Sequence, residues 1–261
     1  MTNKEKFFDA VEKGRLGKNL GLSIGSPKLM NFIDGYLPET SYLIGALSGA
    51  GKSTYVLYSF VYKPLMDFLN GNLPNRDPYW IMFSLEMTSE QIYSKLISLY
   101  IFEHFGEELS FKEMFSRGKD CMLSDDKFEL LQQCDEFLNI LDKRIIFYEG
   151  TLNAEKYKNF VLTTLQKFGH FSGETYYPNN PERIIGVIVD HCSLIRATNG
   201  RSKKEEMDLM SSYSVQLRNR YKISPIHVMQ FNRDASNQER MKQDLQEPTY
   251  NDFKDSGTIR L

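Results

Sequence analysis

The sequence predicts an α/β fold, in which a mostly parallel, twisted sheet carries helices on both faces. Continuous apolar runs over 79–84 and 184–189 are typical of strands that are buried on both sides. Segments with helical hydrophobic spacing alternate with these runs, and such alternation indicates parallel βαβ units. A third apolar run, 41–46, leads directly into a glycine-rich turn and a helix start.

The chain begins with two predicted helices ahead of the sheet. Residues 3–14 have an amphipathic helical pattern, and a glycine-rich connector follows them. Ser26 and Pro27 supply an N-cap and a first-turn proline for the second helix, which Gly35 ends. The first helix either packs against a neighbouring copy of the chain or frays as an exposed terminus.

Hydrophobic spacing and capping signals predict the remaining elements. One helix runs from Lys52 to about Leu69, with a kink expected at Pro64. Thr88 and Gln91 form a capping box that starts another helix. The rest of the predicted order is helix 127–141, strand 144–148, helix 153–168, loop 170–182, strand 184–189, helix 204–221 and strand 225–229.

Composition and net charge limit the classes of protein to which the chain can belong. The chain has 261 residues, of which 41% are hydrophobic and 25% charged, enough for one large α/β domain. Its net charge of -2 provides no global basic field, so any contact with nucleic acid must come from local loops. Because no apolar run approaches a membrane span and the N-terminus lacks a signal-peptide core, we expect a cytoplasmic protein without membrane partners.

Cysteine and histidine spacing gives no metal site. The three cysteines (Cys121, Cys134 and Cys192) form no C-x-x-C pair, which argues against a zinc site or a disulfide framework and fits a reducing cytosol. The four histidines (His104, His170, His191 and His227) share no ligand spacing, so we interpret them as buried or surface residues.

The turn after the first strand has the pattern of a phosphate-binding loop. Residues 46–54 read Ala-Leu-Ser-Gly-Ala-Gly-Lys-Ser-Thr, with Ala46 where the pattern has glycine. A loop that opens a helix directs N–H groups and partial positive charge at one point. Lys52 can reach the β- and γ-phosphates, and the Ser53 hydroxyl can bind Mg²⁺. We therefore predict a nucleoside triphosphate site formed by Ser48, Gly49, Ala50, Gly51, Lys52, Ser53 and Thr54.

Polar residues follow three further strands, and in a parallel sheet these positions meet at one edge. Asp190 has the position of a residue that holds Mg²⁺ or its water. Glu86 is placed to polarise an attacking water, and Gln230 to sense the γ-phosphate. Taken singly, each has an ordinary alternative, such as ending a strand or complementing a helix dipole.

Five motifs in order give the chain a resemblance to a known family. The stretches 46–54, 83–91, 188–194, 229–233 and 252–257 are similar to motifs of the RecA-like motor domain in DnaB-type replicative helicases. The resemblance covers roughly residues 20–259. It implies a RecA-like P-loop NTPase domain over 21–261, preceded by an N-terminal helix and linker over 1–20.

The resemblance also implies roles for residues and partners. Lys52 and Ser53 would bind ATP and Mg²⁺, with Glu86 as the catalytic carboxylate, Asp190 as the Mg²⁺ partner and Gln230 as the γ-phosphate sensor. The implied function is a hexameric ring that moves along single-stranded DNA and unwinds duplex during replication, with primase or a helicase loader as further partners. The implied location is the cytoplasm of a bacterium or of a phage-infected host. The implied contacts with single-stranded DNA are Lys254, Asp255 and Gly257.

The chain also departs from the family's pattern. The family has an N-terminal helical domain with no counterpart here, and it continues beyond the position of Ile259 to an arginine finger for the neighbouring ATP site. Such a finger is worth about 10³–10⁵ in rate. By this comparison the motor domain is C-terminally incomplete: a fragment, half of a split gene, or a minimal phage-type protein completed by another chain.

Two other functions remain open at this stage. A nucleotide-binding assembly module would bind ATP and oligomerise with weak turnover. A RecA-, RadA- or KaiC-like ATPase would share the core sheet. Arg201, Lys203 and Lys204 fit either a second DNA-contacting loop or a solvated charged loop.

Overall fold

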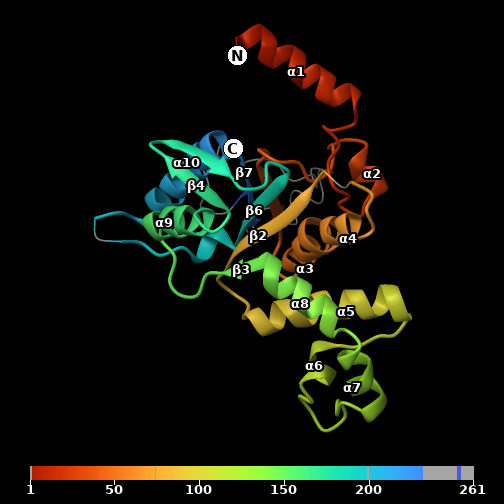
Figure 1. Cartoon of the computed structure of the whole chain (residues 1–261). Helices are drawn as coiled ribbons and strands as arrows, with labels where there is room; N and C mark the ends of the chain where they lie inside the picture. Colours follow the sequence, from red (N-terminus) through yellow and green to blue (C-terminus); the bar gives the residue numbers. More distant parts are fainter. Residues whose placement is uncertain (1, 74, 199, 232–251, 254–261) are drawn as a thin grey trace, which may run out of the picture.

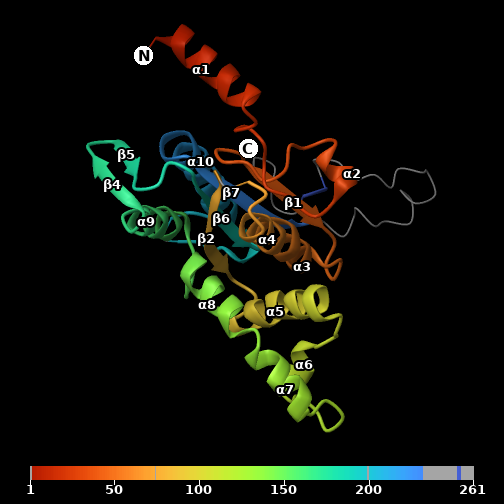
Figure 2. The same ribbon diagram turned by 45° about the vertical axis from the view of Figure 1, so that its right-hand side comes forward.

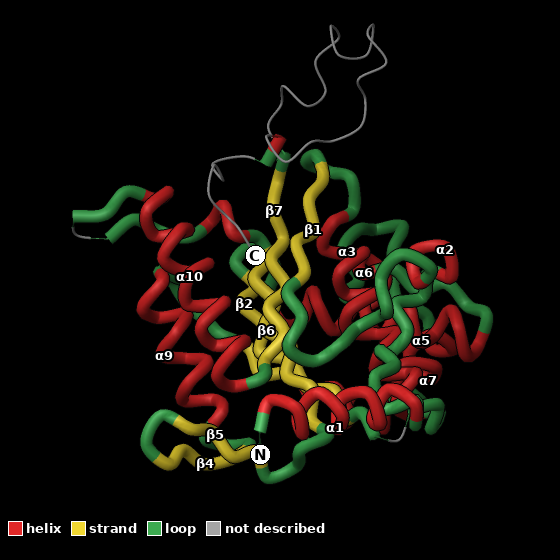
Figure 3. The backbone as a smooth tube through the Cα atoms, turned by 90° about the horizontal axis from the view of Figure 1, so that it is seen from above, coloured by secondary structure: helices red, strands yellow, loops and turns green. Residues whose placement is uncertain are grey.

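The computed structural model describes residues 2–73, 75–198, 200–231 and 252–253. Within them the centre is a five-stranded sheet with the order β1-β7-β6-β2-β3, and every neighbouring pair is parallel. Figures 1 and 3 show these strands side by side between two groups of helices. The predicted α/β class with a mostly parallel sheet is confirmed. The strands are β1 (Tyr42–Ala46), β2 (Asp77–Ser84), β3 (Ile145–Phe147), β6 (Arg183–Asp190) and β7 (Ile223–Gln230).

Helices cover both faces of this sheet, as the continuous apolar runs predicted. Alternate residues of β2 enter separate hydrophobic cores: Trp80 and Met82 lie in one, and Ile81 and Phe83 in the other. This alternation places each strand between two helical layers. The first layer contains α3 (Lys52–Leu57), α4 (Lys63–Leu69), α5 (Ser89–Phe105) and α8 (Asp135–Arg144), and the second contains α9 (Ala154–Leu165) and α10 (Lys203–Tyr221).

The helix after the phosphate loop is distorted just before Pro64. A π-helical segment, Tyr58–Tyr62, separates α3 from α4, and the Lys63 N–H bonds to the Tyr58 carbonyl. Pro64 has no N–H to offer the carbonyl of Phe60, four residues earlier, and its ring would clash there in a regular helix. The Trp80 indole N–H donates to that carbonyl at 2.7 Å instead. A side chain from the neighbouring strand thus satisfies the group that the proline leaves free.

Some predicted elements differ from those observed. The predicted loop 170–182 is wrong in part, because β4 (Gly169–Ser172) and β5 (Thr175–Pro178) form an antiparallel hairpin. Gly173, with φ +60°, allows the tight turn between these strands. The predicted helix 127–141 is two helices, α7 (Asp125–Gln132) and α8.

The end of one predicted helix and the start of another also differ from the prediction. The helix predicted to run to Gly35 is the single turn α2 (Pro27–Met30). Lys203 and Lys204 belong to the first turn of α10 rather than to a loop, because Ser202 caps that helix. A short 3₁₀ segment, Cys192–Leu194, follows β6.

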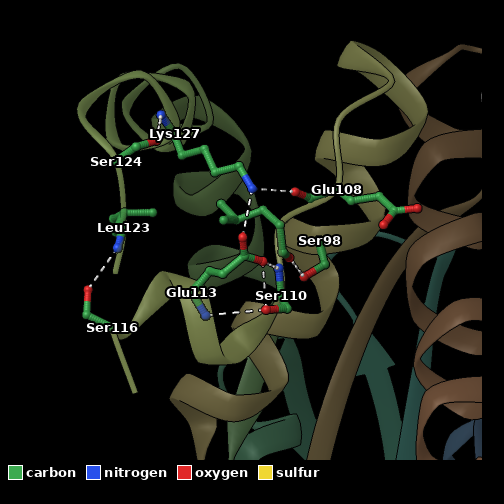
Figure 4. Close-up of polar contacts among 9 residues, drawn as sticks. Ser98, Glu108, Ser110, Glu113, Ser116, Leu123, Ser124 and Lys127 are labelled. Atoms are coloured by element: carbon green, nitrogen blue, oxygen red, sulfur yellow. Dashed lines mark hydrogen bonds and ion pairs between the residues drawn. The ribbon is translucent and has the colours of Figure 1, made fainter. Parts of the chain in front are cut away.

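A helical lobe extends from the sheet between α5 and α8 (Figures 1 and 2). It contains α6 (Phe111–Met114) and α7. Lys127 of α7 holds it together by contacting the Glu113 carboxylate at 2.8 Å and the Glu108 carbonyl at 3.2 Å (Figure 4). Ser110 forms a capping box with Glu113. The Ser98 hydroxyl of α5 donates to the Leu109 carbonyl and joins the lobe to α5.

Helix α1 (Asn3–Arg15) projects from the rest of the chain in Figures 1 and 2. It has no buried residue, and the side chains of Phe7, Phe8 and Val11 are exposed. Among the described helices, none has the length and apolar character needed to cross a membrane.

Candidate functional site

The loops that follow four neighbouring strands meet at one edge of the sheet. Ala46 of β1 pairs with Gln230 of β7, and Ser84 of β2 pairs with Asp190 of β6. The loop after β1 and the turn after β2 therefore open beside the ends of β7 and β6. A cavity of ≈ 270 Å³ lies there, lined by Ser48, Gly49, Gly51, Lys52, Ser53, Thr54, Glu86, Met87, Lys95, His191 and Gln230.

The loop before α3 has the shape of an anion cradle. Gly51 is the N-cap residue of α3 and has φ +83°, which a residue with a side chain rarely adopts. No side chain caps α3, so the N–H groups of its first turn have no side-chain acceptor. The Lys52 ammonium donates to the Leu47 carbonyl at 2.9 Å and so lies over its own loop. Backbone donors and one cation thus face the same space.

Asp190 is buried behind this loop, with 6% of its surface exposed. Burial raises the pKa of its carboxyl group, and the Ser53 hydroxyl acts in the opposite direction. Its Oδ1 atom is buried and has no hydrogen-bond partner among the described residues. An unpaired carboxylate oxygen beside a hydroxyl suits a hard divalent cation, so Ser53 and Asp190 fit Mg²⁺.

Protein ligands alone would not complete such a site. Within the described residues, no group of three or more His, Cys, Asp or Glu side chains could hold a metal ion. Mg²⁺ usually keeps water and takes phosphate oxygens in addition to one or two carboxylates. The two side chains present are therefore sufficient only when phosphate is also bound.

Glu86 and Gln230 reach the cavity from two different strands. The Leu85 N–H donates to the Asp190 carbonyl at 2.8 Å and extends the pairing of β2 with β6 beyond the strand. The Glu86 side chain is 60% exposed, so the carboxylate can turn within the cavity. Gln230 is the last residue of β7, and the Phe231 N–H bonds to the Ala46 carbonyl at 3.0 Å.

Three lining residues were not predicted from the sequence: Met87, Lys95 and His191. Lys95 of α5 donates to the Thr54 hydroxyl at 3.0 Å. His191 lies with Nε2 3.8 Å from Oε2 of Glu86, and its side chain is 13% exposed. Burial lowers the pKa of His191, against the opposing effect of the Glu86 and Asp190 carboxylates. The one available signal for His191 was its position directly after Asp190.

Other predicted site residues lie elsewhere. Ala50 is not among the residues that line the cavity. Lys254, Asp255 and Gly257 lie outside the described residues. Phe253, just before them, forms a bridge with Phe231 and packs against its ring. Gly45 lies under both rings, since a Cβ there would come within 2.3 Å of Phe253.

The chain has a parallel α/β fold that it shares with solved structures, and its cavity lies at the carboxyl ends of the strands. One solved structure with this fold is described as an ATPase domain, with a TM-score of 0.68 and 17% identity, covering 99% of this chain and 79% of that chain. The resemblance to DnaB-type helicases is therefore confirmed at the level of the fold.

A second solved structure is a DnaB-like replicative helicase, described with its interactions with primase. It has a TM-score of 0.64 and 16% identity, covering 98% of this chain and 54% of that chain. This chain thus spans about half of that protein's length. No protein-family model and no curated protein matches the sequence.

Proposed function

We propose that this chain is the ATPase motor domain of a DnaB-type DNA helicase, which uses ATP and Mg²⁺. The main observation behind this proposal is that one cavity is lined by Lys52, Ser53, Glu86 and Gln230. Asp190 lies directly behind Ser53. The fold shared with a solved ATPase domain and with a DnaB-like replicative helicase supports the proposal. In the complete function, a hexameric ring of copies moves along single-stranded DNA and separates duplex during replication.

The reaction is an in-line attack of water on the γ-phosphorus of ATP. The water oxygen bonds to the γ-phosphorus while the bond to the β–γ bridging oxygen breaks, which leaves ADP and phosphate. Glu86 takes the proton that the water loses. Lys52 and the N–H groups of the loop offset charge on the phosphates, and Gln230 hydrogen-bonds the γ-phosphate. Ser53 and Asp190 would hold Mg²⁺, which supplies further positive charge beside the phosphates.

The proposed DNA contact follows from the motif order in the sequence. Lys254, Asp255 and Gly257 would bind phosphates of single-stranded DNA. Asp252 and Phe253 directly precede them, and Phe253 is anchored on Phe231, the residue after Gln230. A DNA contact at this segment would therefore be connected to Gln230, the proposed γ-phosphate sensor, through the packing of Phe253 on Phe231.

The proposed ring would cover apolar surface that is exposed in the single chain. Phe7, Phe8 and Val11 of α1 are exposed on a helix with no buried residue. Packing against a neighbouring copy would remove these side chains from water. Primase or a helicase loader would be further partners of the assembled ring.

The decisive test is DNA-stimulated ATP hydrolysis. Lys52→Ala and Glu86→Gln should each lower kcat by about 10²–10⁴-fold, the range for loss of a catalytic acid–base group or charge stabiliser. Lys167→Ala and Glu107→Gln are matched controls, because both side chains are exposed and away from the cavity. Equal rates in all variants, or hydrolysis that single-stranded DNA leaves unchanged, would count against the motor function.

A further inference from the structure

The ring of His191 lines the cavity beside Glu86, a proposed catalytic group. It follows Asp190 directly, and its Nε2 atom lies 3.8 Å from Oε2 of Glu86. Its other ring nitrogen, Nδ1, is buried and has no hydrogen-bond partner among the described residues. The ring is 13% exposed whereas the Glu86 side chain is 60% exposed. A fixed ring thus stands beside a carboxylate that is free to turn.

The surroundings assign the proton of the neutral ring to Nε2. A neutral imidazole has one N–H donor and one bare acceptor nitrogen. With the proton on Nδ1, a buried donor would be unpaired and a bare nitrogen would face the Glu86 carboxylate, so both contacts would be unfavourable. With the proton on Nε2, the N–H faces the carboxylate and only an acceptor is left unpaired. A small rotation of the exposed Glu86 side chain closes the separation to hydrogen-bond length.

We propose that His191 is a positioning residue, whose Nε2–H holds the Glu86 carboxylate in the orientation that activates water. The proposal rests on the proposed ATPase function and adds a residue to it. A general base must lie within hydrogen-bond reach of the proton that it takes, and a mobile carboxylate meets this condition only part of the time. His191 therefore affects turnover through Glu86.

Three variants of His191 separate positioning from packing. In His191→Gln, the terminal amide nitrogen can take the place of Nε2 and still donate to Glu86. In His191→Asn, the amide nitrogen corresponds instead to Nδ1, too far back to reach Glu86. His191→Phe keeps a ring of similar shape and removes both nitrogens. Even if the Phe variant does not fold, comparison of His191→Gln with His191→Asn tests whether a donor at the Nε2 position is needed.

The expected result is a loss in kcat without a loss in binding. His191→Asn and His191→Phe should lower kcat by about 10–100-fold, the usual effect of removing a residue that orients an active-site group. KM for ATP should stay within about twofold of the wild-type value, because the variants leave the contacts that bind ground-state ATP unchanged. His191→Gln should recover most of kcat. In a Glu86→Gln background the same substitutions should have no further effect, because the group they orient is gone.

Two outcomes would overturn the proposal while the ATPase function stands. One is full activity in His191→Asn and His191→Phe when Glu86→Gln abolishes activity. The other is an equal loss from His191→Phe with and without Glu86→Gln. If Glu86→Gln leaves the wild-type rate unchanged, the proposed function itself fails, and the role of His191 fails with it. A thermal unfolding midpoint for each variant identifies losses caused by misfolding.

Discussion

The ring of Phe253 packs edge-on against the ring of Phe231, with centroids 4.9 Å apart and planes at 76°. The two residues also form an isolated antiparallel bridge. Phe231 directly follows Gln230, the predicted γ-phosphate sensor, and Phe253 directly precedes the predicted DNA contact at Lys254. This aromatic pair therefore connects the segment of the proposed γ-phosphate sensor with the segment that precedes the proposed DNA contact.

Gly45→Ala should separate these functions. Its Cβ would lie 2.3 Å from Phe253 and 2.5 Å from Phe231, so one or both rings must move. We expect a destabilisation of about 1–3 kcal/mol, as for overpacking elsewhere, and weaker DNA stimulation of the ATPase with nucleotide binding retained. Denaturant unfolding and ATPase assays with single-stranded DNA measure both. Gly14→Ala, on exposed α1, is the matched control, and an unchanged DNA response in Gly45→Ala would contradict the expected coupling.

Asp190→Asn should weaken Mg²⁺ dependence more than nucleotide binding. The buried Asp190 carboxylate, which contacts Ser53 and has an unpaired Oδ1, is the protein's proposed carboxylate ligand, and the amide removes its charge. We expect the Mg²⁺ concentration for half-maximal hydrolysis to rise at least about tenfold, in line with losses on altering metal-site residues. A Mg²⁺ titration of ATP hydrolysis measures it. Asp125→Asn, at an exposed position of α7, should leave the Mg²⁺ concentration for half-maximal hydrolysis unchanged. The same curve for both variants would argue against Asp190 as a Mg²⁺ ligand.

His227 should make the fold sensitive to mild acid. It is fully buried, its Nε2 atom lies 3.1 Å from the Ser214 hydroxyl, and burial lowers its pKa from 6.5 to about 4. The unfolded chain therefore binds a proton first as pH falls. The contribution of His227 to stability should be constant above pH 6.5 and should decline between 6.5 and about 4, by roughly 3 kcal/mol in total.

Urea unfolding across this pH range checks the prediction. His227→Phe should flatten that part of the pH dependence, whatever its effect on stability at neutral pH. His104→Gln, at an exposed position, should keep the wild-type slope. A slope that survives the His227 substitution would assign the acid sensitivity to another group.

The helical lobe should loosen at a much lower pH. The hydrogen bond from Lys127 is the largest cause that lowers the pKa of Glu113, to about 2, and the Ser110 backbone and hydroxyl contribute. Because the folded pKa is depressed, the stabilising contribution is present above the ordinary value of 4.5 and is lost as pH falls towards 2.

Lys127→Met should raise the pKa of Glu113 towards its ordinary value and speed amide exchange in α6 and α7. NMR titration of the Glu113 carboxyl and hydrogen exchange measure these effects. Lys112→Met changes the lysine next to Glu113 in α6 and should alter neither. A Glu113 that still titrates near 2 without Lys127 would be inconsistent with this contact.

The sequence predicted the features that local patterns determine. Apolar runs located β2 and β6, and the capping box at Thr88 and Gln91 is present where spacing placed it. The convergence of Glu86 and Lys52 on one cavity was also predictable, because the carboxyl ends of parallel strands share an edge.

What could not be predicted depends on contacts between distant segments. The π-helical segment depends on the indole of Trp80, which satisfies the Phe60 carbonyl from another strand. The β4–β5 hairpin depends on packing of Phe171 against Tyr221 of α10. The approach of His191 to Glu86 depends on the register of β6 against β2, which sequence spacing does not give.

Lys52 and Gln230 are far apart along the chain, yet they line one cavity. A bound nucleotide would contact the loops that follow β1 and β7, the first and last strands along the described chain, which lie side by side in the sheet. A ligand that binds only the folded state adds about 2.7 kcal/mol of stability at one hundred times its Kd. If the proposed nucleotide site is correct, resistance to proteolysis in the cell would rise and fall with the supply of nucleotide.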